Sequence, residues 1–376
     1  MTGKRKNKGN FPNLRFPGFE GEWEVKKLGE IGDVKMCRRV FNEETSIIGE
    51  IPFFKIGSFG KEADAFISRE LYSDYRKRFS FPKKGNILIS AAGTIGRTVV
   101  YNGEDAYYQD SNIVWIDNDN TKITNEFLFH ILQIVKYNTE GGTIQRLYNN
   151  ILKSTKFSSP TISEQSKIAD FLTLINDRIQ TQKKIIEGLK VLKTQTRNQL
   201  FTQIIKENNE QISVKDILNY EQPTKYIVSS TEYSSDKKLP PVLTANKAFI
   251  LGYTEENFGI YNKGNCIILD DFTMDLKYVD FHFKVKSSAI KILTSKEGVN
   301  LKFIYEYFSF LNFSSGEHKR HYISEIENKF ITLPKIKLQN KTADYLSLLD
   351  DKITVELEIQ DLFIQQKKFL LANLFI

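Results

Sequence analysis

The chain has 376 residues, of which 40% are hydrophobic, and its formal net charge is +7. The hydrophobic content excludes a disordered chain. The length is sufficient for two or three domains, each with its own core. The excess of Lys and Arg favours a polyanionic partner. Two cysteines far apart in sequence imply no disulfide framework, so we expect a protein of the reducing cytoplasm. No apolar run approaches the roughly 18 residues that span a bilayer, and we expect residues 1–10 to be disordered.

The first part of the chain is predicted to form short strands followed by one helix. Glycine-containing turns separate the apolar runs. Phe127, Ile131 and Val135 lie on one face at helical spacing, and Thr124 or Asn125 is placed to cap that helix. The predicted strands are Ile51–Phe54, Ile87–Ser90, Arg97–Tyr101 and Asn112–Ile116.

A long helix is predicted from Pro160 to Phe201. Thr161 and Glu164 fit a capping box at its start, and Gly188 should weaken it by about 1 kcal/mol relative to Ala. Its apolar residues alternate at spacings of three and four, which is the pattern of a coiled-coil seam. The seam consists of Leu172, Ile175, Ile179, Ile186, Leu189 and Leu200, with polar positions at Gln182, Lys193 and Thr196.

The second part of the chain repeats this order. Strands are predicted at Val242–Thr244, Cys266–Leu269, Val279–Val285 and Ala289–Leu293, and a short helix capped by Asn300 follows. A second long helix is predicted from Pro334 to Phe375. Its seam consists of Leu346, Leu349, Ile353, Phe363, Leu370 and Leu374, with polar positions at Glu356, Gln360 and Lys367.

The two long segments correspond residue by residue at a constant shift of 174. Gln165 matches Gln339 and Leu172 matches Leu346, and upstream Arg146 matches Arg320. A repeat at this distance indicates a duplicated domain. Chance similarity between amphipathic helices is the alternative, but the shared order of strand, short helix, loop and long helix argues against it.

We therefore predict an α+β protein with two similar globular domains, each a curled sheet with few helices, separated by two long helices packed as an antiparallel coiled coil. The alternative is that each helix packs along its own domain. The predicted boundaries are 1–157 for the first domain, 158–205 for the central helix, 206–332 for the second domain and 333–376 for the distal helix.

Two surface segments are candidates for contact with DNA. The turn Gly93–Thr98 combines glycines, which allow close approach of the backbone, with Thr94 and Arg97. The second segment is a repeated loop of residue types that bond to bases and stack on them. The alternative interpretation is that both segments are solvated turns with ordinary surface charges and no contact with DNA. The loop's candidate residues are Gln145, Arg146, Tyr148, Asn149 and Lys153, and those of its copy are Lys319, Arg320 and Tyr322.

Catalytic and metal-binding motifs are not found. His318 and His321 lack further ligands nearby, and the Gly93–Thr98 turn lacks the lysine of a phosphate-binding loop. The run Asp117–Asn120 fails as a calcium loop because Lys122 stands where glycine is required. We predict no catalytic residue, no metal site and no cofactor in this chain.

The sequence resembles the specificity subunits of type I restriction-modification systems. The resemblance is carried by the alternation of variable head and repeated helix, by Leu14–Phe19 followed by Trp23, by Gly85–Ser90 with Gly93–Gly96, and by Pro160 with Glu164–Gln165. It covers essentially the whole chain. The second copy departs from it, because Leu338 replaces the glutamate and Asp270–Thr273 replaces the Gly-Thr-Ile-Gly turn.

This resemblance implies a non-catalytic reader of double-stranded DNA. In the family each head reads one part of a split target, and the helices set the gap and dock methyltransferase subunits. S-adenosylmethionine, ATP and magnesium would belong to those subunits and to a restriction subunit. Because the two heads differ, the target is expected to be asymmetric. The rival classes are a coiled-coil protein scaffold and a stand-alone DNA-modifying enzyme.

Overall fold

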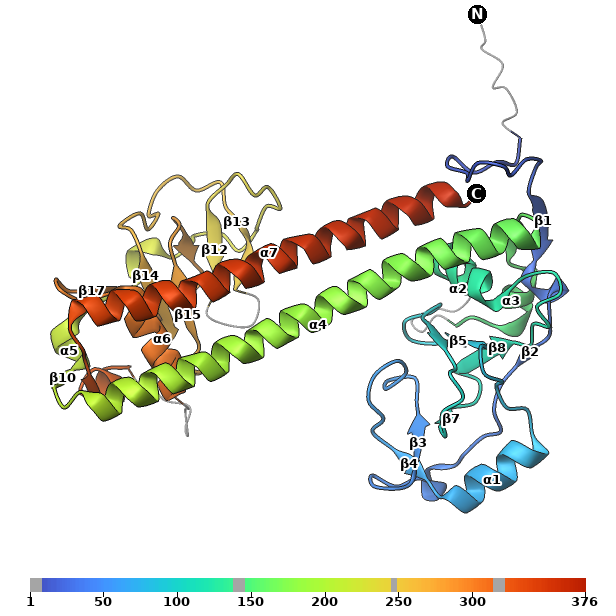
Figure 1. Cartoon of the computed structure of the whole chain (residues 1–376), viewed down its shortest axis with the longest axis horizontal. Coiled ribbons are helices and arrows are strands. Elements are labelled where there is room, and N and C mark those ends of the chain that lie inside the picture. The colour runs from blue at the N-terminus through green and yellow to red at the C-terminus, as the bar shows by residue number, and fades with distance from the viewer. Residues whose placement is uncertain (1–8, 138–145, 245–248, 314–321) are drawn as a thin grey trace, which may run out of the picture. The chain divides into compact units, whose positions relative to one another are not determined.

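The computed structural model describes residues 9–137, 146–244, 249–313 and 322–376 (Figure 1). The chain divides into two compact units. Unit 1 comprises Met1–Gln182 and Ile359–Ile376, and unit 2 comprises Lys183–Glu358. Each unit therefore combines one globular head with a part of each long helix.

The described part of the head of unit 1 contains three small sheets. The four-stranded sheet has the order β2 (Val34–Lys35), β8 (Ile113–Ile116), β5 (Ile87–Ser90) and β6 (Thr98–Val100), and its pairings are antiparallel. The three-stranded sheet has the order β4 (Phe66–Ile67), β3 (Ile51–Phe54) and β7 (Tyr107–Tyr108), with β3 and β7 parallel. A two-stranded sheet joins β1 (Glu24–Lys27) to β9 (Lys156–Ser159). The helices are α1 (Arg69–Arg78), α2 (Asn125–Ile134) and α3 (Asn149–Ser154), with short 3-10 turns at Leu28–Glu30 and Asn42–Glu44.

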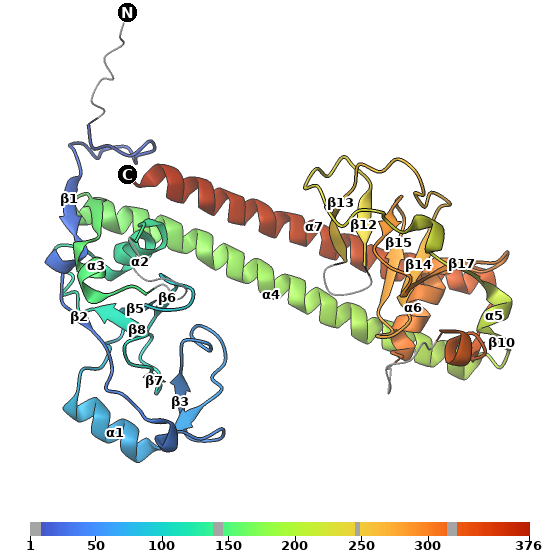
Figure 2. The same ribbon diagram turned by 180° about the vertical axis from the view of Figure 1, so that it is seen from behind.

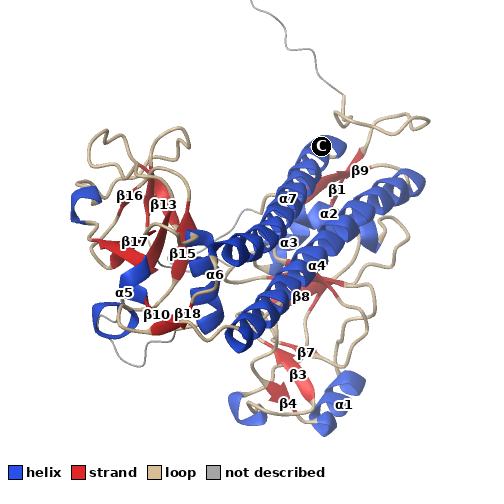
Figure 3. Cartoon of the chain, turned by 60° about the vertical axis from the view of Figure 1, so that its left-hand side comes forward, coloured by secondary structure: helices blue, strands red, loops and turns tan. Residues whose placement is uncertain are grey.

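The head of unit 2 repeats this plan. Its four-stranded sheet has the order β11 (Leu218–Glu221), β17 (Ile290–Ser295), β14 (Cys266–Asp270) and β15 (Leu276–Val279). Its three-stranded sheet, β13 (Ile250–Tyr253), β12 (Pro241–Leu243) and β16 (Lys284–Val285), again contains one parallel pair, and β10 (Gln211–Ser213) pairs with β18 (Phe330–Thr332). The helices are α5 (Val214–Ile217) and α6 (Leu301–Leu311), with a 3-10 turn at Thr224–Tyr226 and a π-helical turn at Tyr322–Ile326. The duplication inferred from the repeat is thus present in the strand order of both heads. Figure 3 shows the strands of both heads in red and the helices in blue.

Most predicted elements are confirmed, and two predictions are wrong. The strand expected over Val279–Val285 is interrupted, because β15 ends at Val279 and β16 begins only at Lys284. The first head also contains α1 and α3 besides the single supporting helix that was expected. The predicted caps are present: the Thr124 hydroxyl accepts a hydrogen bond from the backbone N–H of Phe127 at 3.2 Å, and the Asn300 side chain accepts one from Phe303 at 2.9 Å.

The long helices are α4 (Ile162–Glu207) and α7 (Ile336–Leu374). Helix α4 is continuous through Gly188 and extends beyond the predicted end at Phe201. At its start the Thr161 hydroxyl accepts from the backbone N–H of Glu164 at 3.5 Å. The Glu164 carboxylate accepts two hydrogen bonds of 2.8 Å from Arg15. The Thr161 half of the predicted capping box is therefore present, whereas the Glu164 carboxylate forms an ion pair that fastens the N-terminal segment to the helix.

In each unit the two long helices lie side by side and run in opposite directions (Figures 1 and 2). In unit 1 the guanidinium of Arg178 lies 5.9 Å from the centre of the Phe363 ring, and the start of α4 shares a core with the end of α7. In unit 2 the Nζ atom of Lys193 lies 2.6 Å from the Asp350 carboxylate. Every apolar position of the predicted seam is buried or half-buried: Leu172, Ile175, Ile179, Ile186, Leu189, Leu200, Leu346, Leu349, Ile353, Phe363, Leu370 and Leu374.

Candidate nucleic-acid interface

The turn that follows β5 in unit 1 is built around glycine. Gly93 and Gly96 have φ angles of +63° and +79°, which L side chains rarely adopt. A Cβ atom on Gly96 would lie 2.8 Å from the Tyr137 ring, so the turn also needs glycine to pack against that side chain. The Ser90 hydroxyl accepts from the backbone N–H of Arg97 at 2.9 Å and donates to the carbonyl of Thr94. The turn is rigidly closed, and Thr94 is exposed at its tip.

The structure brings this turn together with the other predicted segment of the first head. Ala92 and Arg146 form an antiparallel bridge, and the backbone N–H of Leu147 donates to the carbonyl of Ala91 at 2.9 Å. Arg146 is exposed, and Tyr148 is 47% exposed. Two stretches about 50 residues apart in sequence therefore present adjacent basic and aromatic side chains.

The Arg97 side chain forms a hydrogen bond within the head and is therefore only partly available at the surface. Its Nη1 atom donates to the carbonyl of Phe59 at 2.8 Å, and the residue is half-buried. This bond ties the β3–β4 connection to the turn. Arg97 thus braces the surface and presents only part of its guanidinium there.

Asn149 and Lys153 lie on α3, directly after Tyr148. Asn149 is the first residue of the helix and is exposed. The Nζ atom of Lys153 lies 2.7 Å from the Asp33 carboxylate, and this hydrogen bond lowers the pKa of Asp33. Lys153 is therefore already paired with an anion, whereas Asn149 is directed to the surface. Gln145 lies outside the described residues.

Sequence reasoning missed a group of residues beside the turn. The backbone N–H of Ala91 donates to the Asn112 carbonyl at 2.8 Å, which places the β7–β8 loop next to Ala92. The Nε atom of Arg39 donates to Asp110 of that loop at 2.8 Å, and the Arg39 side chain is 59% exposed. Arg38 stands next in sequence. The adjacent Arg38–Arg39 pair was the signal that could have identified this part of the surface.

A second basic group surrounds one aromatic ring. The guanidinium groups of Arg38 and Arg78 lie 5.2 and 5.3 Å from the centre of the Phe79 ring. Arg76, Lys77 and Arg78 form the C-terminal turn of α1 and are exposed. The ring holds two cations at a fixed place on the surface.

In unit 2 the corresponding surface is built with different chemistry. Asp270 replaces the glycine turn: its carboxylate accepts from the backbone N–H groups of Phe272 and Thr273 at 2.8 and 2.9 Å. Tyr322, the repeat partner of Tyr148, is 1% exposed and packs 5.4 Å from the Tyr220 ring. Its burial contradicts the predicted role of Tyr322 as a DNA contact. The sequence alone could not predict that Tyr322 is buried, because the tyrosine at the matching position of the first copy, Tyr148, is exposed. Lys319 and Arg320 lie outside the described residues.

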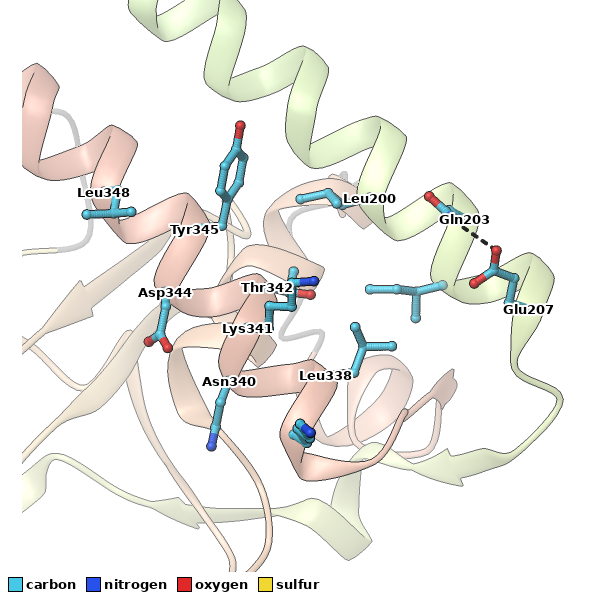
Figure 4. A pocket seen from close by; sticks show the side chains of 12 residues that line it. Leu200, Gln203, Glu207, Leu338, Asn340, Lys341, Thr342, Asp344, Tyr345 and Leu348 are labelled. Atoms are coloured by element: carbon cyan, nitrogen blue, oxygen red, sulfur yellow. Dashed lines mark hydrogen bonds between the residues drawn. The ribbon is translucent and has the colours of Figure 1, made fainter.

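The outer faces of the long helices carry apolar side chains. In unit 2 a groove of about 850 Å³ lies between the end of α4 and the start of α7, and Leu200, Ile204, Leu338, Tyr345 and Leu348 line it (Figure 4). Further along α7, Val355, Leu362 and Phe369 are exposed at intervals of seven residues from Leu348.

No group of three or more His, Cys, Asp or Glu side chains that could hold a metal ion occurs among the described residues. Within the same ranges, no helix is long and apolar enough to cross a membrane.

Two sheet-based heads attached to paired long helices define a protein with a duplicated architecture. Comparison with known sequences shows which family the chain resembles. The family model of the type I restriction modification DNA specificity domain matches residues 20–191. A protein of Haemophilus influenzae described as a type I restriction enzyme specificity subunit is 52% identical over 168 residues, which cover 44% of this chain and 43% of that protein.

Two further relatives are similar to the chain. A type I restriction enzyme specificity subunit of Escherichia coli is 41% identical over 167 residues, covering 40% of this chain and 41% of its own length. The match thus spans less than half the length of each of these first two relatives. The MjaIX specificity subunit of Methanocaldococcus jannaschii is 24% identical over 392 residues, covering 88% of both chains.

Solved structures show the same fold. The S subunit of a type I restriction-modification system from M. genitalium superposes with a TM-score of 0.63 at 17% identity, covering 97% of this chain and 99% of that one. A chain from a structure that describes complex assembly of the type I system has a TM-score of 0.50 at 11% identity, covering 96% and 98%. The present chain is thus similar to the specificity (S) subunits of type I restriction-modification systems, and the family model matches its first half, residues 20–191.

Proposed function

We propose that this chain is the non-catalytic DNA-recognition subunit of a type I restriction-modification complex, in which each head reads one half of a split, asymmetric DNA target. The observation that carries the proposal is the pair of duplicated but chemically different surfaces. Unit 1 joins Ala92 to Arg146 through the backbone, whereas unit 2 has Asp270 and Asp271 at the matching position. Heads with the same scaffold and different surface side chains suit two different half-sites.

In the first head, different residues would serve affinity and specificity. Arg146 and Asn149 are exposed and have the donors that bond to base edges in the major groove. Tyr148 offers an exposed ring for apolar contact. Arg39 and the cations around Phe79 are suited to phosphates, which position the protein without reading sequence. For the second head, Lys319 and Arg320 remain candidates on sequence alone.

The long helices would set the gap between half-sites and dock methyltransferase subunits. The exposed residues Leu348, Val355, Leu362 and Phe369 stand at heptad spacing on α7, outside the buried seam. Side chains in this pattern accept an amphipathic helix from a partner. S-adenosylmethionine would be bound by the methyltransferase subunits, and ATP and magnesium by a restriction subunit, all in the cytoplasm.

Reconstitution of the chain with its methyltransferase subunits on a library of random duplexes tests this proposal. Sequencing for methylated adenine is expected to return one split, asymmetric motif, and the chain alone is expected to transfer no methyl group. Transfer by the chain alone would favour the stand-alone enzyme, and a complex with no DNA preference would favour the protein scaffold.

In the same assay, the variant Arg146→Ala tests which half of the motif is read by the first head. It is expected to relax the base preference in one half of the motif only, because each head reads separately, with discrimination falling by about 1–3 kcal/mol per base pair no longer read. Lys190→Ala on the exposed face of α4 removes the same charge and should leave the motif unchanged. An equal loss at both halves would contradict separate reading by the two heads.

A further inference from the structure

One exposed serine in the head of unit 1 is held in a backbone conformation that serine rarely adopts. Ser111 lies in the loop between β7 and β8 and has a φ angle of +60°. The loop is closed by backbone hydrogen bonds, from Ile113 to the Gln109 carbonyl at 3.2 Å and from Asn112 to the Asp110 carbonyl at 2.6 Å. Left-handed conformations are unfavourable for residues other than glycine, and such residues cluster at functional sites. Glycine would fit this position better than serine, so the serine side chain itself calls for an explanation.

The neighbours of Ser111 determine where its hydroxyl hydrogen points. The Oγ atom donates to a carboxylate oxygen of Asp110 at 3.2 Å and lies 3.8 Å from the Sδ atom of Met36. An ionised carboxylate and a thioether sulfur only accept hydrogen bonds, whereas a hydroxyl has one hydrogen and two lone pairs. The hydrogen of Ser111 is therefore already used within the loop. What the hydroxyl can offer to another molecule is an acceptor.

Ser111 stands beside the strand that carries Arg146. The backbone N–H of Ala91 donates to the Asn112 carbonyl at 2.8 Å, so the next residue of the loop, Ser111, lies next to Ala92. On its other side Ala92 forms the bridge with Arg146. Paired strands lie about 4.8 Å apart, so Ser111 and Arg146 are separated by about 10 Å. This distance corresponds to about three base pairs at about 3.4 Å each, and both side chains can therefore serve one half-site.

A second arginine lies on the opposite side of Ser111. Strand β8 stands between β5 and β2 in the sheet, and the segment that follows β2 contains Met36 and Arg39. The Met36 Sδ atom accepts from the backbone N–H of Ser111 at 3.2 Å, and the Nε atom of Arg39 donates to Asp110 at 2.8 Å. Arg146 thus lies toward β5 and Arg39 toward β2. The Ser111 hydroxyl is inside the candidate interface and not at its margin.

We propose that Ser111 is a specificity-determining residue of the first head, whose hydroxyl accepts a hydrogen bond from the exocyclic amino group of adenine or cytosine in the major groove. Adenine N6 and cytosine N4 are the donors that the major groove presents. Guanine and thymine present only acceptors there, which a hydroxyl that donates to Asp110 cannot bond. The inference rests on the proposed function and adds to it the chemistry of one position in the first half-site.

Two glycine variants separate the hydroxyl from the backbone. Ser111→Gly removes the hydroxyl and relieves the left-handed conformation, so the variant is expected to fold and to assemble. Asn120→Gly is the matched control. Asn120 is also exposed and left-handed, with a φ angle of +64°, but it lies beyond the other end of β8. It should leave the recognised motif unchanged.

Both variants are reconstituted with methyltransferase subunits, and their equilibrium binding to a library of random duplexes is compared with that of the wild type. Ser111→Gly is expected to lose about tenfold of its preference at one base pair, in the half of the motif that Arg146→Ala affects. The other half should stay as in the wild type.

A second measurement removes the amino group from the DNA at that base pair. Adenine is replaced by purine, or cytosine by pyrimidin-2-one. The wild-type complex is expected to bind the altered duplex about tenfold more weakly than the unaltered one. The Ser111→Gly complex should bind both duplexes equally, because the partner of the amino group is already absent.

The outcomes are distinguishable. If the wild-type complex recognises no split motif, the proposed function fails before this inference is tested. If it does, a Ser111→Gly complex that keeps every base preference overturns the role of Ser111. Relaxation in both halves, or an equal relaxation by Asn120→Gly, also overturns it, since the backbone would then be the cause. A wild-type complex that is insensitive to removal of the amino group excludes the proposed hydrogen bond.

Discussion

The side-chain oxygen of Gln165 accepts a hydrogen bond of 3.0 Å from the backbone N–H of Thr124, the residue that caps α2. Its Nε2 atom donates to the carbonyl of Pro160 at 2.9 Å, just before α4. Gln339 repeats this arrangement with Asn300 at 2.9 Å and Pro334 at 2.8 Å. One glutamine in each unit therefore fastens the start of the short helix to the start of the long helix. Gln165 is completely buried and Gln339 is almost completely buried, which explains why glutamine occupies this position in both copies of the repeat.

Replacement of Gln165 should destabilise unit 1. Gln165→Leu leaves the N–H of Thr124 and the carbonyls of Pro160 and Lys122 without their partner. We expect a loss of about 3 kcal/mol, the low end of the sum over three groups that each cost about 1–3 kcal/mol when buried and unsatisfied, because these bonds are only partly buried. Both tryptophans of the chain, Trp23 and Trp115, lie in unit 1, so their fluorescence during urea unfolding reports on this unit.

Two controls accompany that measurement. Gln180→Ala, on the exposed face of the same helix, should change the midpoint little. Gln339→Leu should shift the tryptophan transition less than Gln165→Leu does, because Gln339 lies in unit 2. Equal shifts for the Gln165 and Gln339 variants would show that the glutamines do not act within their own units.

Gly188→Ala is expected to stabilise the protein. Gly188 lies inside α4, is exposed, and has no atom within 4 Å of the place where a Cβ would stand. Alanine is favoured over glycine inside a helix by about 1 kcal/mol, so the thermal midpoint followed by circular dichroism should rise. An unchanged or lower midpoint would indicate that the helix needs a flexible point there.

The sequence predicted the long helices well because their pattern is local. Residues at spacings of three and four, such as Leu172 and Ile175, identify the buried face without reference to the rest of the chain. Only the Thr161 half of the capping box is formed, because Arg15, about 150 residues away, binds the Glu164 carboxylate. Strands such as β16, with only Lys284 and Val285, are too short for their pattern to be recognised.

The candidate interface was less predictable because it is assembled from distant segments. The contact between Ala92 and Arg146 follows from sheet topology and not from either stretch alone. Likewise, the ion pair between Asp271 and Lys291 follows from the pairing of β14 with β17 and not from either stretch alone. Tyr148 and Tyr322 show the limit most directly: they occupy the same repeat position, yet one is exposed and the other buried, because Tyr220 offers a ring only to the second.

The stability of unit 2 should depend on pH through Asp350. Burial raises the pKa of this carboxyl, but hydrogen bonds from Lys193 and Lys302 outweigh that effect and lower it below its ordinary value. A carboxyl whose pKa is lower in the folded state contributes stability above its unfolded pKa of about 4, and the contribution is lost as pH falls through the folded value. Asp350→Asn should therefore destabilise the protein at pH 7, and its difference from the wild type should begin to shrink as the pH falls below about 4.

Urea unfolding at pH 7, 5 and 3.5 measures this change in the difference. Thr354→Ala one turn away, at an exposed position, is the matched control and should follow the wild type at every pH. A difference between Asp350→Asn and the wild type that stays constant over this range would exclude the ion pairs as its cause.

The proposed spacer role of the helices predicts how an insertion changes the target. Lys193 pairs with Asp350, and the helices run in opposite directions, so Gly188 and Val355 lie at nearly the same level in unit 2. Seven residues inserted after each position keep the heptad seam in phase and lengthen the pair by about 10 Å. At about 3.4 Å per base pair, the gap in the methylated motif should widen by about three base pairs while both half-sites stay the same. An unchanged gap would show that something other than α4 and α7 sets the distance.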